Sequence, residues 1–398
     1  MFQLLLAIIY LAFISLGLPD GLLGAAWPFM YVQFDVPVSY SGIIFMIIAA
    51  GTIVSSLLSD RMTKKWGTGK VTAMSVAMTA LALFGFSFSH SFWLLCLWAI
   101  PYGLGAGGVD ASINNYVAIH YESKHMSWLH CMWGLGATIG PYIMGAVLSN
   151  GQIWNMGYRY VGILQLILTA ILIFSLPLWK ERKPNGATDA DGIITDGEGS
   201  QNIADEPLKM RDIFAIPGAR ETFIMFFCYC AIEQTAGLWA SSYLVLGRGI
   251  DAQTAATFAS LFYIGITVGR GISGFITMKL NDEKMIWMGL GIIAIGIMMI
   301  LLPLGDIVAL AGLIVIGLGC APVYPCVVHS TPARFGEDKS QAIIGVQMAF
   351  AYVGTCFMPP IFGLIAEHIN IVLFPVYMLA ILVLMVYMHK LVCKKTRC

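Results

Sequence analysis

The stretch Gly103–Asp110, which reads GLGAGGVD, has a later counterpart in Gly317–Tyr324, which reads GLGCAPVY. Further pairs keep nearly the same offset: Pro141–Gly145 with Pro359–Gly363, Gly136 with Gly354 and, more faintly, Gly51–Lys65 with Gly269–Glu283. An ordered series of matches at one offset indicates an internal duplication, because shared glycine richness alone would scatter the offsets. The chain is therefore expected to consist of two related halves.

Composition places both halves in a membrane. The chain has 398 residues, of which 58% are hydrophobic and 11% are charged, and its mean hydropathy is +0.80. Soluble domains carry roughly 25% charged residues, so a water-soluble protein is excluded and a multi-pass integral membrane protein is indicated. Equal numbers of basic and acidic residues, 22 each, give no general attraction to nucleic acid.

Twelve apolar runs are long enough to cross a bilayer as helices, each of which needs about 20 residues. The predicted fold is therefore all-α, with twelve transmembrane helices in two pseudo-symmetric six-helix bundles. The runs span residues 4–32, 38–59, 70–89, 92–119, 127–149, 157–179, 218–247, 253–278, 285–304, 307–331, 341–366 and 371–390.

Basic residues set the predicted orientation. If both termini are cytoplasmic, every Lys and Arg except Arg159, Arg248 and Arg270 falls on the cytoplasmic side, as the positive-inside rule requires. The longest polar break is acidic and reads as a flexible cytoplasmic linker. The predicted domains are an N-terminal bundle over residues 1–180, this linker over 181–217, and a C-terminal bundle over 218–398.

A charged segment between the second and third runs carries a family resemblance. Ser56–Lys65, SLLSDRMTKK, resembles the loop 2–3 signature of the major facilitator superfamily, with Ser56 and Thr63 in place of two glycines. Its charged core is retained in Asp60, Arg61 and Lys64. In the family this loop stabilises one state of an alternating-access cycle, which implies a gating and structural role for these three residues. An Asp at a helix end is stabilised by nearby cations and by a neighbouring helix N-terminus.

Within that superfamily the chain resembles the fucose/glucose–galactose permease branch over nearly its whole length. The best stretches are Gly103–Tyr116, Leu129–Pro141, Glu233–Trp239 and Gly317–Pro325. The resemblance implies a sugar:proton symporter, a monomer in the bacterial inner (plasma) membrane, whose site lies between the halves near mid-membrane. The expected partners are a small-molecule substrate, such as a sugar, and membrane lipid.

Three carboxylates lie deep inside the runs: Asp20 in the first, Asp110 in the fourth and Glu233 in the seventh. Ionisable groups at this depth are costly and usually functional, so we expect them to serve proton coupling. The resemblance implies the same for Asp20 and Asp110, because the permeases carry acidic residues there. Satisfied structural carboxylates remain the alternative. Arg270, in the eighth run, is expected to neutralise a carboxylate or to bind an anionic substrate. The favoured interpretation is structural, either as an ion pair or as an Arg bonded to carbonyl groups between helices.

Amides and aromatic rings supply candidate substrate contacts. Asn114 is four residues after Asp110, so the two side chains share a helix face and offer both donors and acceptors to sugar hydroxyls. His130 and Trp133 stand one turn apart where related permeases tend to have amides, which departs from the family pattern. Helix packing is the alternative throughout. The other candidates are Asn115, Trp27, Gln165, Gln234, Trp239, Tyr324 and Gln347.

The favoured function is proton-coupled uptake of a monosaccharide or a similar small polar solute by alternating access. No phosphate-binding G-x-x-x-x-G-K-[ST] motif and no His/Cys ligand set for a metal occurs, so the sequence indicates neither an enzyme nor a bound cofactor. Sodium stays open as the coupling ion. The alternatives are a proton-antiport exporter of drugs or metabolites, and a membrane receptor or scaffold without transport.

Overall fold

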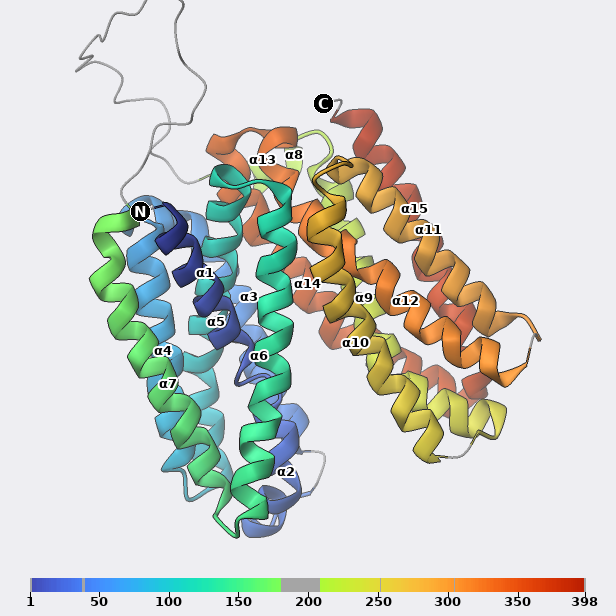
Figure 1. Ribbon diagram of the computed structural model, residues 1–398, viewed down its shortest axis with the longest axis horizontal. Coiled ribbons are helices and arrows are strands. Elements are labelled where there is room, and N and C mark those ends of the chain that lie inside the picture. Colours follow the sequence, from blue (N-terminus) through green and yellow to red (C-terminus); the bar gives the residue numbers. More distant parts are fainter. Residues whose placement is uncertain (1, 38–39, 180–207, 251, 304, 397–398) are drawn as a thin grey trace, which may run out of the picture.

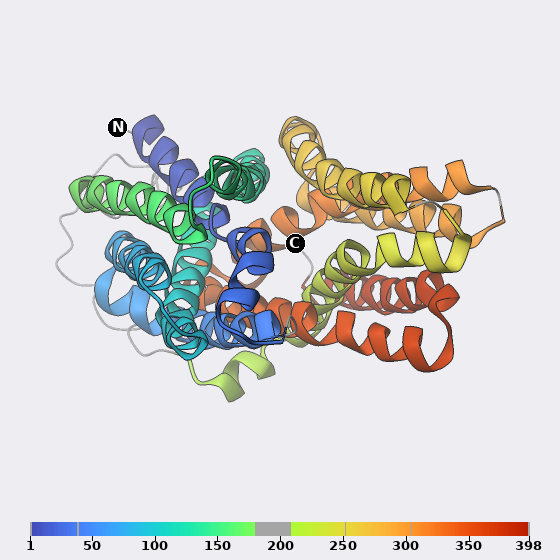
Figure 2. The same ribbon diagram turned by 90° about the horizontal axis from the view of Figure 1, so that it is seen from below.

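The computed structural model describes residues 2–37, 40–179, 208–250, 252–303 and 305–396, and these residues form helices joined by short turns. Helices α1–α7 lie side by side in one part of the molecule, and α9–α15 lie side by side in the other (Figures 1 and 2). We refer to these parts as the N-terminal and C-terminal halves. Residues 181–207 of the predicted linker lie outside the described part of the chain; its last residues include the short helix α8, Met210–Ala215.

The N-terminal half contains seven α-helices within the described residues. They are α1 (Phe2–Gly17), α2 (Leu22–Gln33), α3 (Ser41–Trp66), α4 (Thr68–Ser87), α5 (Phe92–His120), α6 (Ser123–Ser149) and α7 (Trp154–Ser175), followed by a 3₁₀ turn over Leu176–Trp179.

The C-terminal half contains α9 (Ala219–Ser242), α10 (Ala252–Ile276), α11 (Asp282–Leu301), α12 (Asp306–His329), α13 (Thr331–Phe335), α14 (Glu337–Ile365) and α15 (Phe374–Lys395). Single π-helical turns, Tyr243–Gly247 and Ala366–Asn370, extend α9 and α14, and a 3₁₀ turn over Ile371–Leu373 leads into α15.

Hydropathy and helix length agree closely with the predicted runs. Ten stretches of the described residues are long and apolar enough to cross a membrane; one of them, Glu337–Lys395, holds both α14 and α15. The eighth run corresponds to α10, whose apolar part, Leu261–Ile276, is shorter. The first run, 4–32, corresponds to one candidate span, Gln3–Gln33, that contains a helix break. It is divided into α1 and α2 around Pro19, because proline has no N–H to continue the hydrogen-bond ladder.

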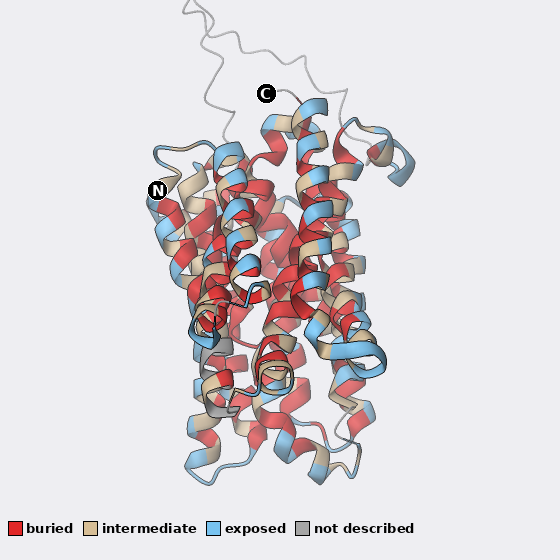
Figure 3. Ribbon diagram, turned by 90° about the vertical axis from the view of Figure 1, so that its right-hand side faces the viewer, coloured by how far each residue is buried: buried red, intermediate tan, exposed pale blue. Residues whose placement is uncertain are grey.

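Burial follows the pattern of a membrane protein. Buried residues concentrate toward the middle of the molecule, and exposed positions follow the outer helix faces (Figure 3). Many exposed side chains are large and apolar, as at Phe174 and Leu246, which are 84% and 74% exposed. In water such surfaces would be a liability, but in a bilayer they meet lipid tails of the same polarity.

The two halves touch at one end of the molecule, the end that carries α8 and α13, here called the α13 end (Figure 1). There α3 packs on α14, and α6 packs on α10. The α3–α14 approach requires glycine, because a Cβ at Gly345 would overlap the carbonyl oxygen of Ser56. At the other end of the molecule α2 and the first turns of α10 diverge (Figure 1).

Candidate substrate and proton site

The break between α1 and α2 positions Asp20. Gly17 at the end of α1 allows that helix to approach α6 so closely that a Cβ there would overlap the carbonyl oxygen of Trp133. The Trp133 indole N–H then donates to Asp20 Oδ2 at 3.0 Å, and the Tyr102 hydroxyl donates to Oδ1 at 3.4 Å. The Asp20 residue remains exposed. A carboxylate with neutral donors and an open face is suited to exchange a proton.

A second set of polar contacts starts at Asp110 on α5. The Asn114 amide, one turn along the helix, donates to Asp110 Oδ1 at 2.8 Å, which confirms that the two side chains share a face. Its carbonyl oxygen lies 3.0 Å from His130 Nε2 on α6. The His130 ring in turn packs edge-on against Tyr324 of α12, with ring centroids 4.5 Å apart. This path runs from the N-terminal half into the C-terminal half.

Arg270 is the buried cation of the C-terminal half. Its guanidinium lies 3.7 Å from Glu233 of α9 and donates to the Tyr229 hydroxyl at 3.4 Å. Both ion-pair residues are buried, with Arg270 3% and Glu233 7% exposed. The guanidinium also lies over two rings, at 5.6 Å from the Trp133 centroid and 6.0 Å from that of Tyr324. The predicted structural ion pair of Arg270 is thus present, and it reaches across to the N-terminal half.

These contacts join into one group of side chains, which we call the central cluster. It draws on α5, α6 and the α1–α2 break from one half and on α9, α10 and α12 from the other. Its members are Asp20, Asp110, Asn114, His130, Trp133, Glu233, Arg270 and Tyr324. Sequence reasoning singled out all eight, but it missed Tyr102 and Tyr229, since tyrosines in membrane helices are common and carry no distinctive signal.

Other candidate residues lie elsewhere in the packing. Asn115 accepts from Ser340 at 2.6 Å, where the halves meet at the α13 end. Gln347 bonds with Thr331 inside the C-terminal half, and Trp239 donates to the Pro359 carbonyl oxygen at 2.9 Å. Trp27 packs edge-on against Phe92 in the core, and Gln234 is half-buried next to Glu233.

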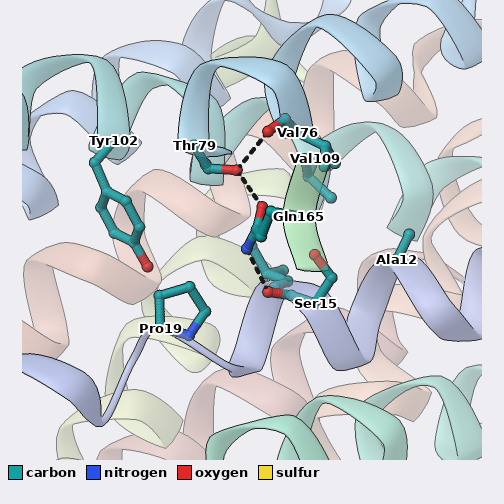
Figure 4. A pocket seen from close by; sticks show the side chains of 9 residues that line it. Ala12, Ser15, Pro19, Val76, Thr79, Tyr102, Val109 and Gln165 are labelled. Carbon is teal, nitrogen blue, oxygen red and sulfur yellow. Dashed lines mark hydrogen bonds between the residues drawn. The ribbon is translucent and has the colours of Figure 1, made fainter. Parts of the chain in front are cut away.

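Gln165 holds three helices of the N-terminal half together. Its amide donates to the Ser15 carbonyl oxygen at 2.7 Å and accepts from Thr79 at 2.6 Å (Figure 4). The adjoining cavity, lined also by Pro19 and Tyr102, has a volume of about 10 Å³. That is room for about one water molecule and not for a sugar.

The signature segment lies at the α13 end, where α3 meets α14. Asp60 is 5% exposed and pairs with Lys64 at 3.3 Å, whereas Arg61 is exposed. Next to Asp60, Ser59 accepts a hydrogen bond from the Gln341 amide of α14 at 3.1 Å. The same amide also donates to the Ala111 carbonyl oxygen at 3.3 Å. Within the described residues the Asp60 carboxylate pairs with Lys64 and accepts no hydrogen bond, so its expected contact with a helix N-terminus stays a prediction.

A further contact between the halves at the α13 end was not anticipated. His329, at the end of α12, lies 2.6 Å from Asp282 through Nδ1 and 3.0 Å from the Tyr121 carbonyl oxygen through Nε2. Asp282 also accepts from the Ser123 hydroxyl of the N-terminal half. These residues are far apart in sequence and each has an unremarkable context, so only the fold brings them together.

Comparison with known proteins identifies the family. The family model of the Major Facilitator Superfamily matches residues 9–359, and the chain therefore belongs to that superfamily. The protein is a multi-pass integral membrane transporter and not an enzyme. The superfamily predicted from the Ser56–Lys65 segment is thus confirmed.

Individual relatives are distant. The chain is 22% identical to the glucose/mannose transporter GlcP of Bacillus subtilis over 79% of this chain and 77% of that protein. It is 24% identical to the hexuronate transporter of the same organism over 68% of this chain and 64% of that protein. Among solved structures it resembles FucP in the outward conformation, with a TM-score of 0.73, 14% identity, and coverage of 96% and 98% of the two chains.

Proposed function

We propose that this protein takes up a monosaccharide or a similar small polar solute together with protons. It would do so by alternating access between two six-helix bundles, residues 1–180 and 218–398, with twelve membrane crossings and both termini in the cytoplasm. The observation that carries the proposal is the central cluster, which combines carboxylates, an amide and aromatic rings where the halves meet. The glucose/mannose and hexuronate transporters among its relatives support a sugar-like substrate.

The chemistry of the cluster suits a polyhydroxylated solute. Asn114 and His130 provide hydrogen-bond donors and acceptors, and they contact each other at 3.0 Å. Sugar hydroxyls both donate and accept, so they can replace such a bond without leaving a polar atom unpaired. Trp133 and Tyr324 add ring faces of the kind that pack against the apolar face of a sugar. These four residues are the substrate contacts that we propose.

The three carboxylates differ in whether a cation lies beside them. Glu233 is neutralised by Arg270 at 3.7 Å, whereas Asp20 and Asp110 form no ion pair within the described residues. An uncompensated carboxylate in a membrane is costly, and taking up a proton removes that cost. We therefore assign the coupling proton first to Asp20, which is exposed, with Asp110 as its neighbour and Glu233 as the counter-ion of Arg270.

Alternating access requires that contacts between the two halves close the path to the substrate site on one side of the membrane at a time. Contacts between the halves at the α13 end, such as Ser340–Asn115 and His329–Tyr121, are suited to close the cytoplasmic side. In the proposed cycle they break when the loaded protein opens inward. The same contacts then re-form in the unloaded protein.

Counterflow in proteoliposomes tests the function. Vesicles preloaded with an unlabelled sugar are expected to take up the same labelled sugar from a panel of hexoses, pentoses and uronic acids. Counterflow needs no net proton movement, so it detects the substrate independently of coupling. Protein-free vesicles provide the background. Absence of counterflow for every sugar, together with efflux of a lipophilic dye, would favour the exporter; absence of any flux would favour the receptor or scaffold.

A further inference from the structure

We infer that Trp133 is the positioning residue through which the charge of Asp20 controls the contact between the two halves. The inference rests on the proposed function, because it assigns the step that links a proton to the opening of the transporter. Trp133 touches both partners: its indole N–H donates to Asp20 Oδ2 at 3.0 Å, and its ring lies 5.6 Å from the Arg270 guanidinium.

One of these contacts is fixed and the other is not. Asp20 and Trp133 belong to the same half, and close packing at Gly17 fixes the backbone between them. Arg270 belongs to the other half and is oriented by Glu233 and Tyr229. When the halves move relative to each other, the Asp20–Trp133 bond therefore moves as a unit while the Trp133–Arg270 distance changes.

The charge on Asp20 alters the strength of the contact between Trp133 and Arg270. An indole N–H that donates to an anion gains electron density in its ring, because linked polar interactions polarise one another. A more electron-rich ring attracts the guanidinium more strongly, and such cation–π contacts are strongest where water is excluded. Ionised Asp20 thus holds the halves together at the α13 end. When Asp20 is protonated, its oxygen polarises the indole ring less, and the contact between Trp133 and Arg270 weakens. The halves then separate more readily at the α13 end.

Other ionisable groups surround Asp20. Tyr102 donates to it from α5, and Asp110 of α5 and Tyr352 of α14 interact with it electrostatically. Tyr102 interacts electrostatically with Tyr352 of α14 but contacts no cation of the opposite half among the described contacts, and the Asp110 side chain is bonded to Asn114. Among the described contacts, Trp133 is the side chain that bonds to Asp20 and also contacts a cation of the opposite half.

The test is a double-substitution cycle on the conformational equilibrium. Spin labels at Glu122→Cys and Lys279→Cys, two exposed positions at the α13 end, report the distance between the halves. Trp133→Phe keeps a ring but removes the N–H. We expect Trp133→Phe and Asp20→Asn each to lower the ratio of closed to open protein about threefold, the size of a modest cation–π change. The double variant should match either single variant.

Trp154→Phe is the matched control, because it also removes an indole N–H, in this case one that donates to Gln33 at 2.7 Å within one half. It should leave the ratio unchanged. If Trp133→Phe does not fold, benzothienylalanine at position 133 keeps the bicyclic shape without the N–H. Independent effects of Trp133→Phe and Asp20→Asn that multiply in the double variant would overturn the inference, as would an unchanged ratio for Trp133→Phe.

Transport measurements separate this inference from the proposed function. Because Trp133 is also a proposed substrate contact, Trp133→Phe should lower both counterflow and sugar accumulation driven by a proton gradient, and the loss of accumulation should exceed the loss of counterflow by about threefold. Equal losses in both would mean that Trp133 only binds substrate, which contradicts the inference. If the wild-type protein shows no gradient-driven accumulation, the proposed function fails, while the distance cycle still decides whether Trp133 transmits the charge of Asp20.

Discussion

At the scale of single residues, the three intramembrane carboxylates have three different environments. Asp20 is exposed and accepts from Trp133 and Tyr102, Asp110 is buried against Asn114, and Glu233 is paired with Arg270. The partner decides what each group can do. A proton on Glu233 would leave the Arg270 cation unpaired, whereas a proton on Asp20 or Asp110 would leave no cation behind.

Substitutions at the buried ion pair test the assignment of Glu233 as a counter-ion. Glu233→Gln and Arg270→Gln should each lower the free energy of unfolding by about 3–5 kcal/mol, because each leaves an unpaired buried charge. The double variant should recover most of that loss and keep proton-driven accumulation. Thermal unfolding in detergent and uptake in proteoliposomes provide the two measurements. A double variant that is less stable than either single variant, or one that has lost coupling alone, contradicts the assignment.

Sequence reasoning found the charged members of the central cluster because a charge inside an apolar run stands out. It also predicted the Asp110–Asn114 contact, since helix geometry fixes which residues share a face. The bonding partners of the other amide side chains were not predictable. Asn115, Gln165 and Gln347 have the same apolar sequence context as Asn114, yet each bonds to a residue outside the central cluster. Their contacts depend on helix rotation and on neighbours distant in sequence.

At the scale of elements, small residues determine where helices approach. Gly17 allows α1 to reach α6, and Gly345 allows α14 to reach α3. The first contact lies within one half and the second joins the two halves. Hydropathy predicted most of these helices, but it did not predict that α1 ends at Gly17 or that α3 pairs with α14, because neither feature changes the apolar content of a run.

A larger side chain at Gly345 should open the α13 end. The Gly345→Val side chain would overlap the Ser56 carbonyl oxygen, and backbone cannot yield as a flexible side chain does. The distance between spin labels at Glu122→Cys and Lys279→Cys should therefore increase, with the folded half-bundles retained. Gly291→Val is the control, because a Cβ at Gly291 meets nothing within 4 Å. An unchanged distance in Gly345→Val, or the same increase in both variants, would refute a closing role for the α3–α14 contact.

At the scale of the whole molecule, the duplicated sequence and the fold agree. The matched stretches Gly103–Asp110 and Gly317–Tyr324 lie on α5 and α12, in opposite halves, and each supplies a member of the central cluster. The superfamily was predictable because the signature segment is short and local. Twelve membrane crossings, the cytoplasmic position of the termini and the coupling ion remain predictions, because they follow from hydropathy, from the charges of the loops and from the intramembrane carboxylates, and not from how the helices pack.

The most direct test of the proposed function is whether sugar carries protons with it. A sugar identified by counterflow is added to lightly buffered proteoliposomes, and the external pH is recorded. Proton-coupled uptake predicts that the external medium becomes alkaline as labelled sugar enters. Asp20→Asn with Asp110→Asn should abolish this change, and Asp306→Asn, an exposed carboxylate paired with Arg248, should not. Entry of labelled sugar at constant external pH would contradict the account.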